Sequence, residues 1–148
     1  LKAFTKTFAM AGLRLGYLLC SDAGLRDRLW NAGQPWSVSA AAQRCGVAAL
    51  GDAAYWEATR RQLPGLRREL WEALRRLPVA AYPSAANYFL FYTDREGLEE
   101  YLLQRGILLR DCSNYPGLRR GYYRAAVRTA PENRRLIAAL QAFFQERT

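Results

Sequence analysis

Residues 1–17 read LKAFTKTFAMAGLRLGY, and this stretch carries the candidate chemistry of the sequence. Arg14 follows Lys6 by eight residues. Gly12 and Gly16 allow the backbone to pass close to a bulky group, and the planar fork of Arg14 suits a phosphate. Spacing alone favours a plainer interpretation, in which Lys6 faces solvent and Arg14 flanks a buried strand.

The composition predicts a folded domain. Of the 148 residues, 51% are hydrophobic and 13% aromatic, which argues against disorder. The net charge of +9 raises nucleic acid as a partner. However, the arginines are spread along the chain as pairs on expected helices, so we expect solvated helix faces and no nucleic acid. Because no apolar run reaches the ~20 residues needed to span a bilayer and no secretory signal opens the chain, we expect no membrane and a cytoplasmic location.

Several chemistries are excluded by residue type. The sequence has no histidine, which rules out Ser–His and Cys–His catalysis within the chain. Cys20, Cys45 and Cys112 lack CxxC spacing, so we expect reduced thiols and no metal site. Of the 22 basic residues 20 are Arg, and only Lys2 and Lys6 carry a primary amine. A guanidinium cannot form an imine with an aldehyde, so a retained lysine hints at amine chemistry.

The first half predicts alternating helices and strands. We expect a buried strand over 15–19 and a helix from Asp22 to about Asn31. An Ala-rich helix should follow from Ser37 or Ser39 to Leu50, and Asp52 should cap the next. A leucine stripe predicts a helix over 53–77, in which Pro64 either introduces a kink or opens a second helix.

The second half predicts a small sheet covered by helices. We expect strands over 87–92, 107–110 and 122–128, a helix over 96–104 and a last helix opening at Pro131. On the last strand, Arg124 and Arg128 should face the same way, on either side of Ala126. The class is α/β (α+β), with an antiparallel or mixed sheet.

The residues of the opening stretch also carry a resemblance. Thr5-Lys6 followed by AGLRLGY at 11–17 resembles the cofactor-lysine signature of the class I/II aminotransferase superfamily (fold type I). The resemblance implies that Lys6 carries pyridoxal 5'-phosphate (PLP) as a Schiff base and that Arg14 contacts the cofactor phosphate. Ala3 stands where the family often has Ser or Thr as a further phosphate ligand, so the resemblance would leave Thr5 to supply that hydroxyl.

Further matches extend to the C-terminus. QPWSVS at 34–39, RDCSNYPGL at 110–118 and YYRAAVR at 122–128 resemble the L-threonine-O-3-phosphate decarboxylase branch, which is related to the histidinol-phosphate aminotransferases. The resemblance implies that Arg110 and Arg124 bind the carboxylate end of a phosphorylated amino-acid substrate. It also places Asn87 near that substrate.

The resemblance predicts an organisation in three parts. Residues 1–50 would end the PLP-binding large domain, 51–77 would connect, and 78–148 would form a small C-terminal domain. Since the family's enzymes are more than twice this long, we expect a C-terminal portion of a lyase or transferase that is inactive alone and a homodimer when full length. An aminotransferase and a non-catalytic binding domain remain as alternatives.

Overall fold

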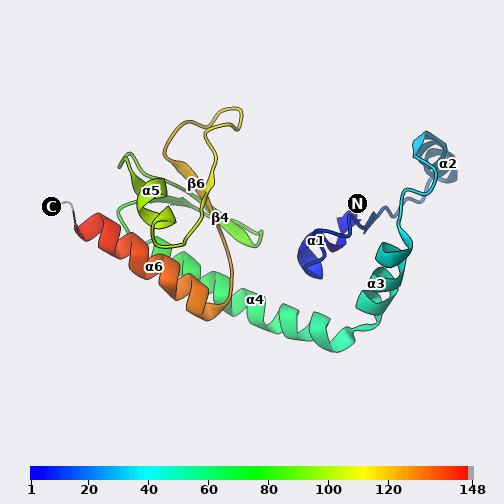
Figure 1. Ribbon diagram of the computed structural model, residues 1–148, viewed down its shortest axis with the longest axis horizontal. Helices are drawn as coiled ribbons and strands as arrows, with labels where there is room; N and C mark the ends of the chain where they lie inside the picture. Colours follow the sequence, from blue (N-terminus) through cyan, green and yellow to red (C-terminus); the bar gives the residue numbers. More distant parts are fainter. Residues whose placement is uncertain (147–148) are drawn as a thin grey trace. The chain divides into compact units, whose positions relative to one another are not determined.

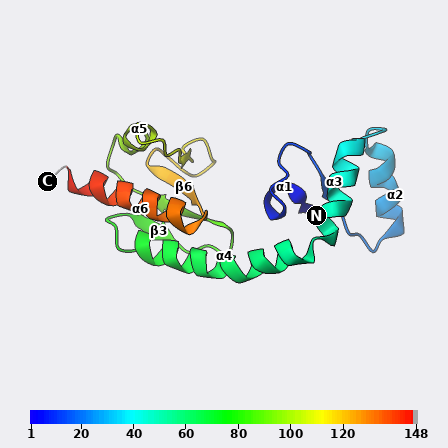
Figure 2. The same cartoon turned by 60° about the horizontal axis from the view of Figure 1, so that its bottom comes forward.

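The computed structural model describes residues 1–146 and forms two compact units, Leu1–Glu57 and Ala58–Thr148. The chain order, drawn in Figures 1 and 2, is β1(Lys2–Ala3), α1(Phe4–Thr7), β2(Gly16–Tyr17), α2(Ala23–Ala32), α3(Ala40–Gly51), α4(Ala53–Leu74), β3(Ala80–Tyr82), β4(Tyr88–Tyr92), α5(Leu98–Leu103), β5(Arg110–Asp111), β6(Tyr122–Ala126) and α6(Ala130–Gln145). Among residues 1–146 we find no helix with both the length and the hydrophobicity of a membrane span. The expected mixed α/β (α+β) class is confirmed.

The first unit opens with a short antiparallel pair. β1 pairs with β2 in the register Lys2↔Tyr17 and Ala3↔Gly16. The prediction of a buried strand over 15–19 is wrong, because the strand covers only Gly16–Tyr17 and both residues are exposed. In the described residues β2 pairs only with the two-residue β1, so the ladder ends where its partner ends.

The core of the first unit is small and aromatic. Phe4 is buried and stacks on Phe8 at 5.1 Å between ring centroids. Leu15 reaches α3 at Gly46, where an added Cβ would lie 2.5 Å from the Leu15 Cδ2. Glycine at this position therefore lets the segment after Arg14 pack on the helix.

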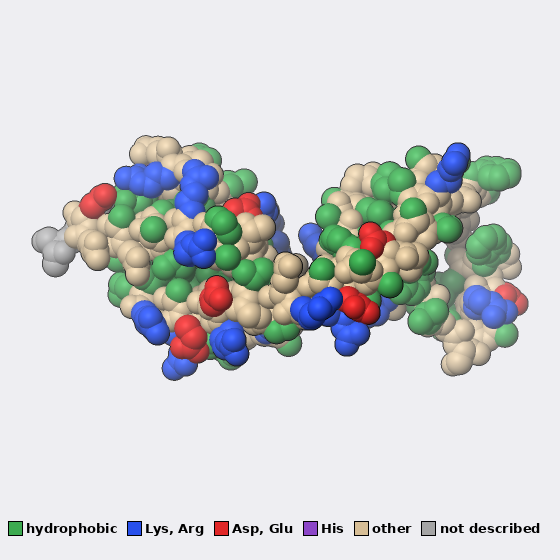
Figure 3. All heavy atoms as spheres, turned by 90° about the horizontal axis from the view of Figure 1, so that it is seen from below, with side chains coloured by type: hydrophobic (Ala, Val, Ile, Leu, Met, Phe, Trp, Pro, Cys, Tyr) green, Lys and Arg blue, Asp and Glu red, His purple; other side chains and the backbone are tan. Residues whose placement is uncertain are grey.

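The helix starts in this unit follow their predicted caps. The Asp22 carboxylate accepts from the Leu25 N–H at 2.9 Å, and Ser39 rather than Ser37 caps α3, accepting from the Ala42 N–H at 3.2 Å. Asp52 caps the start of α4 in the same way. α2 has no buried residue, and Figure 3 shows apolar side chains at the surface of the α2–α3 region.

α4 is one continuous helix with Pro64 inside it. Pro64 therefore does not open a second helix, which settles one of the two predicted alternatives. The helix ends at Leu74, and a turn in which the Leu77 N–H donates to the Leu74 carbonyl at 3.1 Å follows. Leu70 and Leu74 are fully buried and belong to the core of the second unit.

The second unit contains a four-stranded antiparallel sheet in the order β3-β4-β6-β5. β3 was not predicted, and two predicted strands are corrected. The strand predicted over 107–110 covers Arg110–Asp111, because the chain after Gly106 still closes the end of α5, with the Ile107 N–H donating to the Leu102 carbonyl. The strand predicted over 122–128 ends at Ala126.

Helices α4, α5 and α6 contribute to one hydrophobic core against the sheet (Figures 1 and 2). The inward-facing strand residues in this core are Phe89, Phe91, Tyr123 and Ala125. Alternation along the strands turns the next residues to the opposite face. That outer face carries Arg110 and Arg124, which are exposed and half-buried, respectively.

Candidate active site

Lys6 lies in the last turn of the short helix α1. Phe4, at the start of α1, anchors the helix by burial and by an N–H that donates to the Leu15 carbonyl at 3.0 Å. Lys6 itself is exposed, and within residues 1–146 its amine has no hydrogen-bond or ion-pair partner. The half-buried Thr5 precedes it, so a hydroxyl and an unpaired amine occupy consecutive positions on α1.

Arg14 stands in the loop that returns the chain from α1 to β2. Its φ of 52° is in the left-handed region, which non-glycine residues adopt uncommonly. The guanidinium donates to the Ala11 carbonyl at 3.2 Å through Nη1, and the side chain is exposed. The β1–β2 pairing and the Phe4–Leu15 hydrogen bond close this loop, so they place Arg14 and Lys6 on the same small hairpin.

The two glycines of the stretch differ. At Gly16 an added Cβ would lie 2.8 Å from the Lys2 carbonyl, so the close approach there is to the neighbouring strand. At Gly12 nothing lies within 4 Å, which leaves the loop open. The donor set of this hairpin fits PLP: Lys6 supplies a primary amine for an aldehyde, Arg14 a guanidinium for a phosphate, and Thr5 a hydroxyl.

Arg110 and Arg124 lie together in the second unit. They are cross-strand partners in the antiparallel pairing of β5 with β6. Like charges directly opposite each other destabilise a sheet. Neither arginine has a carboxylate partner among residues 1–146. An uncompensated guanidinium pair of this kind suits a carboxylate or phosphate.

Each of these arginines lies over a tyrosine ring. The Arg124 guanidinium carbon is 4.9 Å from the centroid of Tyr88, and that of Arg110 is 5.7 Å from the centroid of Tyr115. The Arg110 Nη2 also donates to the Asn114 Oδ1 at 3.4 Å. The sequence analysis did not identify Tyr88, Tyr115 and Asn114 as site residues. The alternation of side chains along β4 is the signal that could have placed Tyr88 on the same face as Arg124.

Asn87 and Arg128 behave differently. Asn87 is exposed just before β4, and its carbonyl accepts from the Val127 N–H at 2.8 Å, which places it beside the end of β6. Arg128 lies beyond the strand, so the prediction that it shares a strand face with Arg124 is wrong. Its guanidinium pairs with Glu132 at 2.6 Å, and its N–H donates to the Asn133 Oδ1.

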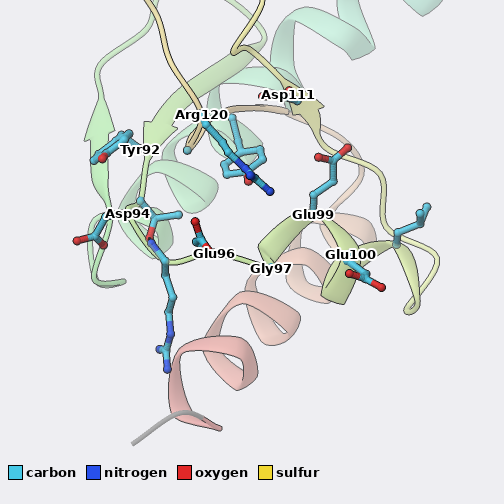
Figure 4. A pocket seen from close by; sticks show the side chains of 13 residues that line it. Tyr92, Asp94, Glu96, Gly97, Glu99, Glu100, Asp111 and Arg120 are labelled. Carbon is cyan, nitrogen blue, oxygen red and sulfur yellow. The ribbon is translucent and has the colours of Figure 1, made fainter.

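A pocket on the other side of β5 is acidic (Figure 4). It has a volume of about 570 Å³, and its lining includes Asp94, Glu99, Glu100 and Asp111 beside Arg120. Alternation along β5 turns Asp111 away from Arg110. This carboxylate lining disfavours an anionic substrate. Within the described residues no group of three or more acidic or cysteine side chains is placed to hold a metal ion.

Comparison with known proteins decides the family. The model of the aminotransferase class I and II family matches residues 1–140. The chain belongs to this family. Membership confirms the resemblance read from residues 5–17, and PLP dependence comes with the family.

Two curated relatives represent the decarboxylase and the aminotransferase branches of the family. The chain is 44% identical over 144 residues to the threonine-phosphate decarboxylase of Salmonella typhimurium, covering 95% of this chain and 40% of the relative. It is 37% identical over 147 residues to the histidinol-phosphate aminotransferase of Symbiobacterium thermophilum, covering 98% and 40%. The chain therefore spans about two fifths of the length of these relatives.

Solved structures give the same two kinds of enzyme. A histidinol-phosphate aminotransferase from Clostridium acetobutylicum superposes with a TM-score of 0.90 at 26% identity, covering 97% of this chain and 45% of that one. An L-threonine-O-3-phosphate decarboxylase from Porphyromonas gingivalis superposes with a TM-score of 0.85 at 28% identity, covering 95% and 44%. The fold is therefore shared with both branches.

Proposed function

We propose that this chain forms part of a PLP-dependent decarboxylase that acts on L-threonine O-3-phosphate, in the biosynthesis of cobalamin. The 44% identity to the Salmonella decarboxylase is the observation that carries the proposal. The outer-face arginine pair supports it, because an unpaired double positive charge suits a substrate with carboxylate and phosphate groups.

The roles follow from the family resemblance and fit the chemistry of each residue. Lys6 would hold the PLP aldehyde through its amine, Arg14 would bind the cofactor phosphate, and Thr5 would supply the hydroxyl that Ala3 lacks. When bound, PLP supplies an electron sink for the bond that breaks at the substrate's Cα. Lys6, whose amine is otherwise unpartnered, moves the proton at Cα as general acid or base.

Arg110 and Arg124 decide the outcome by orientation. They hold the substrate's carboxylate end, with Asn87 beside it. The orientation that they impose on the substrate would select the bond that breaks at Cα. One orientation would favour loss of CO2, and the other would favour removal of the Cα proton by Lys6 and transfer of the amino group. The second outcome is the alternative, a histidinol-phosphate aminotransferase, and the TM-score of 0.90 to such an enzyme favours keeping it.

The experiment uses the full-length gene product with PLP and O-phospho-L-threonine. We expect CO2 release without 2-oxoglutarate, and its abolition in Lys6→Ala. If no CO2 appears and histidinol phosphate instead transfers its amino group to 2-oxoglutarate, the protein moves to the aminotransferase branch. Turnover of neither substrate would contradict both.

The assembly and location are part of the same proposal. We propose a homodimer, as is usual for this family, and a cytoplasmic location. The free thiols of Cys20, Cys45 and Cys112 support a reducing compartment. Size-exclusion chromatography with light scattering tests the first and cell fractionation the second.

A further inference from the structure

The Arg110–Arg124 pair needs an explanation for its stability in the absence of an anion. The two residues are direct partners across β5 and β6, so their side chains leave the sheet on the same face. Asp111 is the adjacent carboxylate, but it faces the other way and accepts from the Ser113 N–H at 3.0 Å and the Ser113 hydroxyl at 2.6 Å. The Asp111 carboxylate therefore does not neutralise the positive charges of the two guanidinium groups.

Tyr88 holds the Arg124 side chain from one side. In the β4–β6 register Leu90 is the partner of Arg124 and Ala126 is the partner of Tyr88, so Tyr88 is the diagonal neighbour of Arg124. The small side chain of Ala126 leaves the space opposite Tyr88 open. The guanidinium of Arg124 occupies it, 4.9 Å from the ring centroid.

Asn114 and Tyr115 hold Arg110 from the other side. They lie in a turn closed by the Tyr115 N–H, which donates to the Cys112 carbonyl at 3.1 Å. The turn brings the Asn114 Oδ1 within 3.4 Å of the Arg110 Nη2 and the ring of Tyr115 within 5.7 Å of the guanidinium carbon. Two contacts from one turn thus orient one guanidinium.

A tyrosine ring suits this task better than a carboxylate. The π face attracts a guanidinium without accepting its N–H groups in the plane. The in-plane donors of Arg124, and those of Arg110 other than the Nη2 N–H that Asn114 accepts, therefore stay available for an oxyanion, which they can meet in bidentate geometry. A carboxylate in the same place would occupy those donors and compete with the substrate.

We propose that Tyr88 and Tyr115 are positioning residues that hold the two arginines as a preformed oxyanion clamp, with Asn114 fixing the edge of Arg110. This inference rests on the proposed function for the role of the arginines, and it assigns to the tyrosines a role in affinity for the anionic substrate. The rings act through the arginines and do not touch the reacting atoms.

The test measures inorganic phosphate binding to the full-length holoenzyme by isothermal titration calorimetry. The double variant Arg110→Gln, Arg124→Gln identifies the heat that belongs to this pair. We expect Tyr88→Leu and Tyr115→Leu each to weaken phosphate binding by roughly two- to fivefold, the worth of an exposed cation–π contact. Tyr88→Phe and Tyr115→Phe keep the aromatic ring and should therefore retain wild-type affinity for phosphate.

Tyr82→Leu is the matched control. Tyr82 lies on the same sheet face and is 39% exposed, as is Tyr88, but it stacks on Tyr122 and contacts neither arginine of the pair. It should leave phosphate affinity unchanged. With substrate, Tyr88→Leu and Tyr115→Leu should raise KM while kcat changes less. If loss of any tyrosine on this sheet face simply weakened the structure, the melting temperature of Tyr82→Leu would fall as well.

The outcomes separate the two proposals. Wild-type phosphate affinity in both Leu variants, or equal loss in the Phe variants, overturns the positioning role even if the enzyme decarboxylates its substrate. Ring-dependent phosphate binding without turnover of O-phospho-L-threonine supports the clamp and contradicts the proposed substrate. Phosphate binding that survives loss of both arginines overturns the clamp.

Discussion

Arg110 and Arg124 face each other across β5 and β6 as register partners, and each guanidinium lies against a tyrosine ring. Two like charges at this spacing persist because aromatic faces attract them and because the outer face is open to water. The pair also acts on its surroundings. Burial raises the pKa of the Cys112 thiol, while the charges of Arg124 and Arg110 oppose that rise.

Replacing Arg124 by lysine should lower substrate affinity, although the charge is kept. A lysine ammonium cannot reproduce the planar fork or stack flat on Tyr88. A lost charged hydrogen bond is worth about 1.5–3 kcal/mol, so KM should rise roughly 10- to 150-fold. Steady-state kinetics of the full-length enzyme measure this. A KM within twofold of wild type would remove Arg124 from the substrate site.

Replacing Lys6 by alanine should remove the covalent link to the cofactor. Borohydride reduction of the wild-type holoenzyme, followed by peptide mass spectrometry, should locate the PLP adduct on Lys6. Loss of a positioned general acid–base costs roughly 10²- to 10⁴-fold in rate. Lys2→Ala is the control, because Lys2 is the other lysine of these 148 residues. An adduct on Lys2 would contradict the assignment.

The start of α6 should make stability depend on acidity. Hydrogen bonds from Arg128 and Thr129 lower the pKa of Glu132 from 4.5 to about 2. Since the folded-state pKa is depressed, the stabilisation is fully present above pH 4.5 and is lost as the pH falls toward 2. Urea unfolding of wild type and Glu132→Gln across this window should show the two curves converging at low pH. Parallel curves would contradict the linkage.

Thr129→Ala should destabilise α6 at neutral pH. Thr129 and Glu132 form a capping box, with the Thr129 N–H donating to the Glu132 Oε2 at 3.2 Å. Loss of such a cap costs about 0.5–2 kcal/mol. Thr129→Ser retains the hydroxyl and should recover most of the free energy of unfolding. Equal stability of all three proteins would show that the cap contributes nothing.

Two glycine-to-alanine substitutions should change the free energy of unfolding in opposite directions. Gly121 has a φ of 97°, and an added Cβ would lie 2.3 Å from the Thr93 carbonyl, so Gly121→Ala should cost at least about 1–3 kcal/mol. Gly65 lies inside α4 with nothing within 4 Å of the added atom. Gly65→Ala should therefore stabilise by about 0.5–1 kcal/mol. Thermal unfolding of the two variants distinguishes them.

The sequence by itself predicted the features that depend on local chemistry. The caps at Asp22 and Asp52 were confirmed, and Ser39 was one of the two predicted starts of α3, because a side-chain oxygen shortly before free N–H groups needs no distant partner. The family also followed from the local stretch around Lys6 and Arg14 and was confirmed by comparison. The site roles of these residues remain predictions, because their test is chemical.

Only the tertiary structure decided what depends on partners far along the chain. Strand ends at Tyr17, Ala126 and Asp111 are set by where a neighbouring strand stops pairing, which periodicity cannot reveal. Pro64 lies within a continuous helix, although its missing N–H allowed a break. Register also placed Arg110 opposite Arg124, because the pairing of β5 with β6 brings together two separate segments of the chain. The end of β6 at Ala126 left Arg128 outside the sheet, where it pairs with Glu132 at the start of α6.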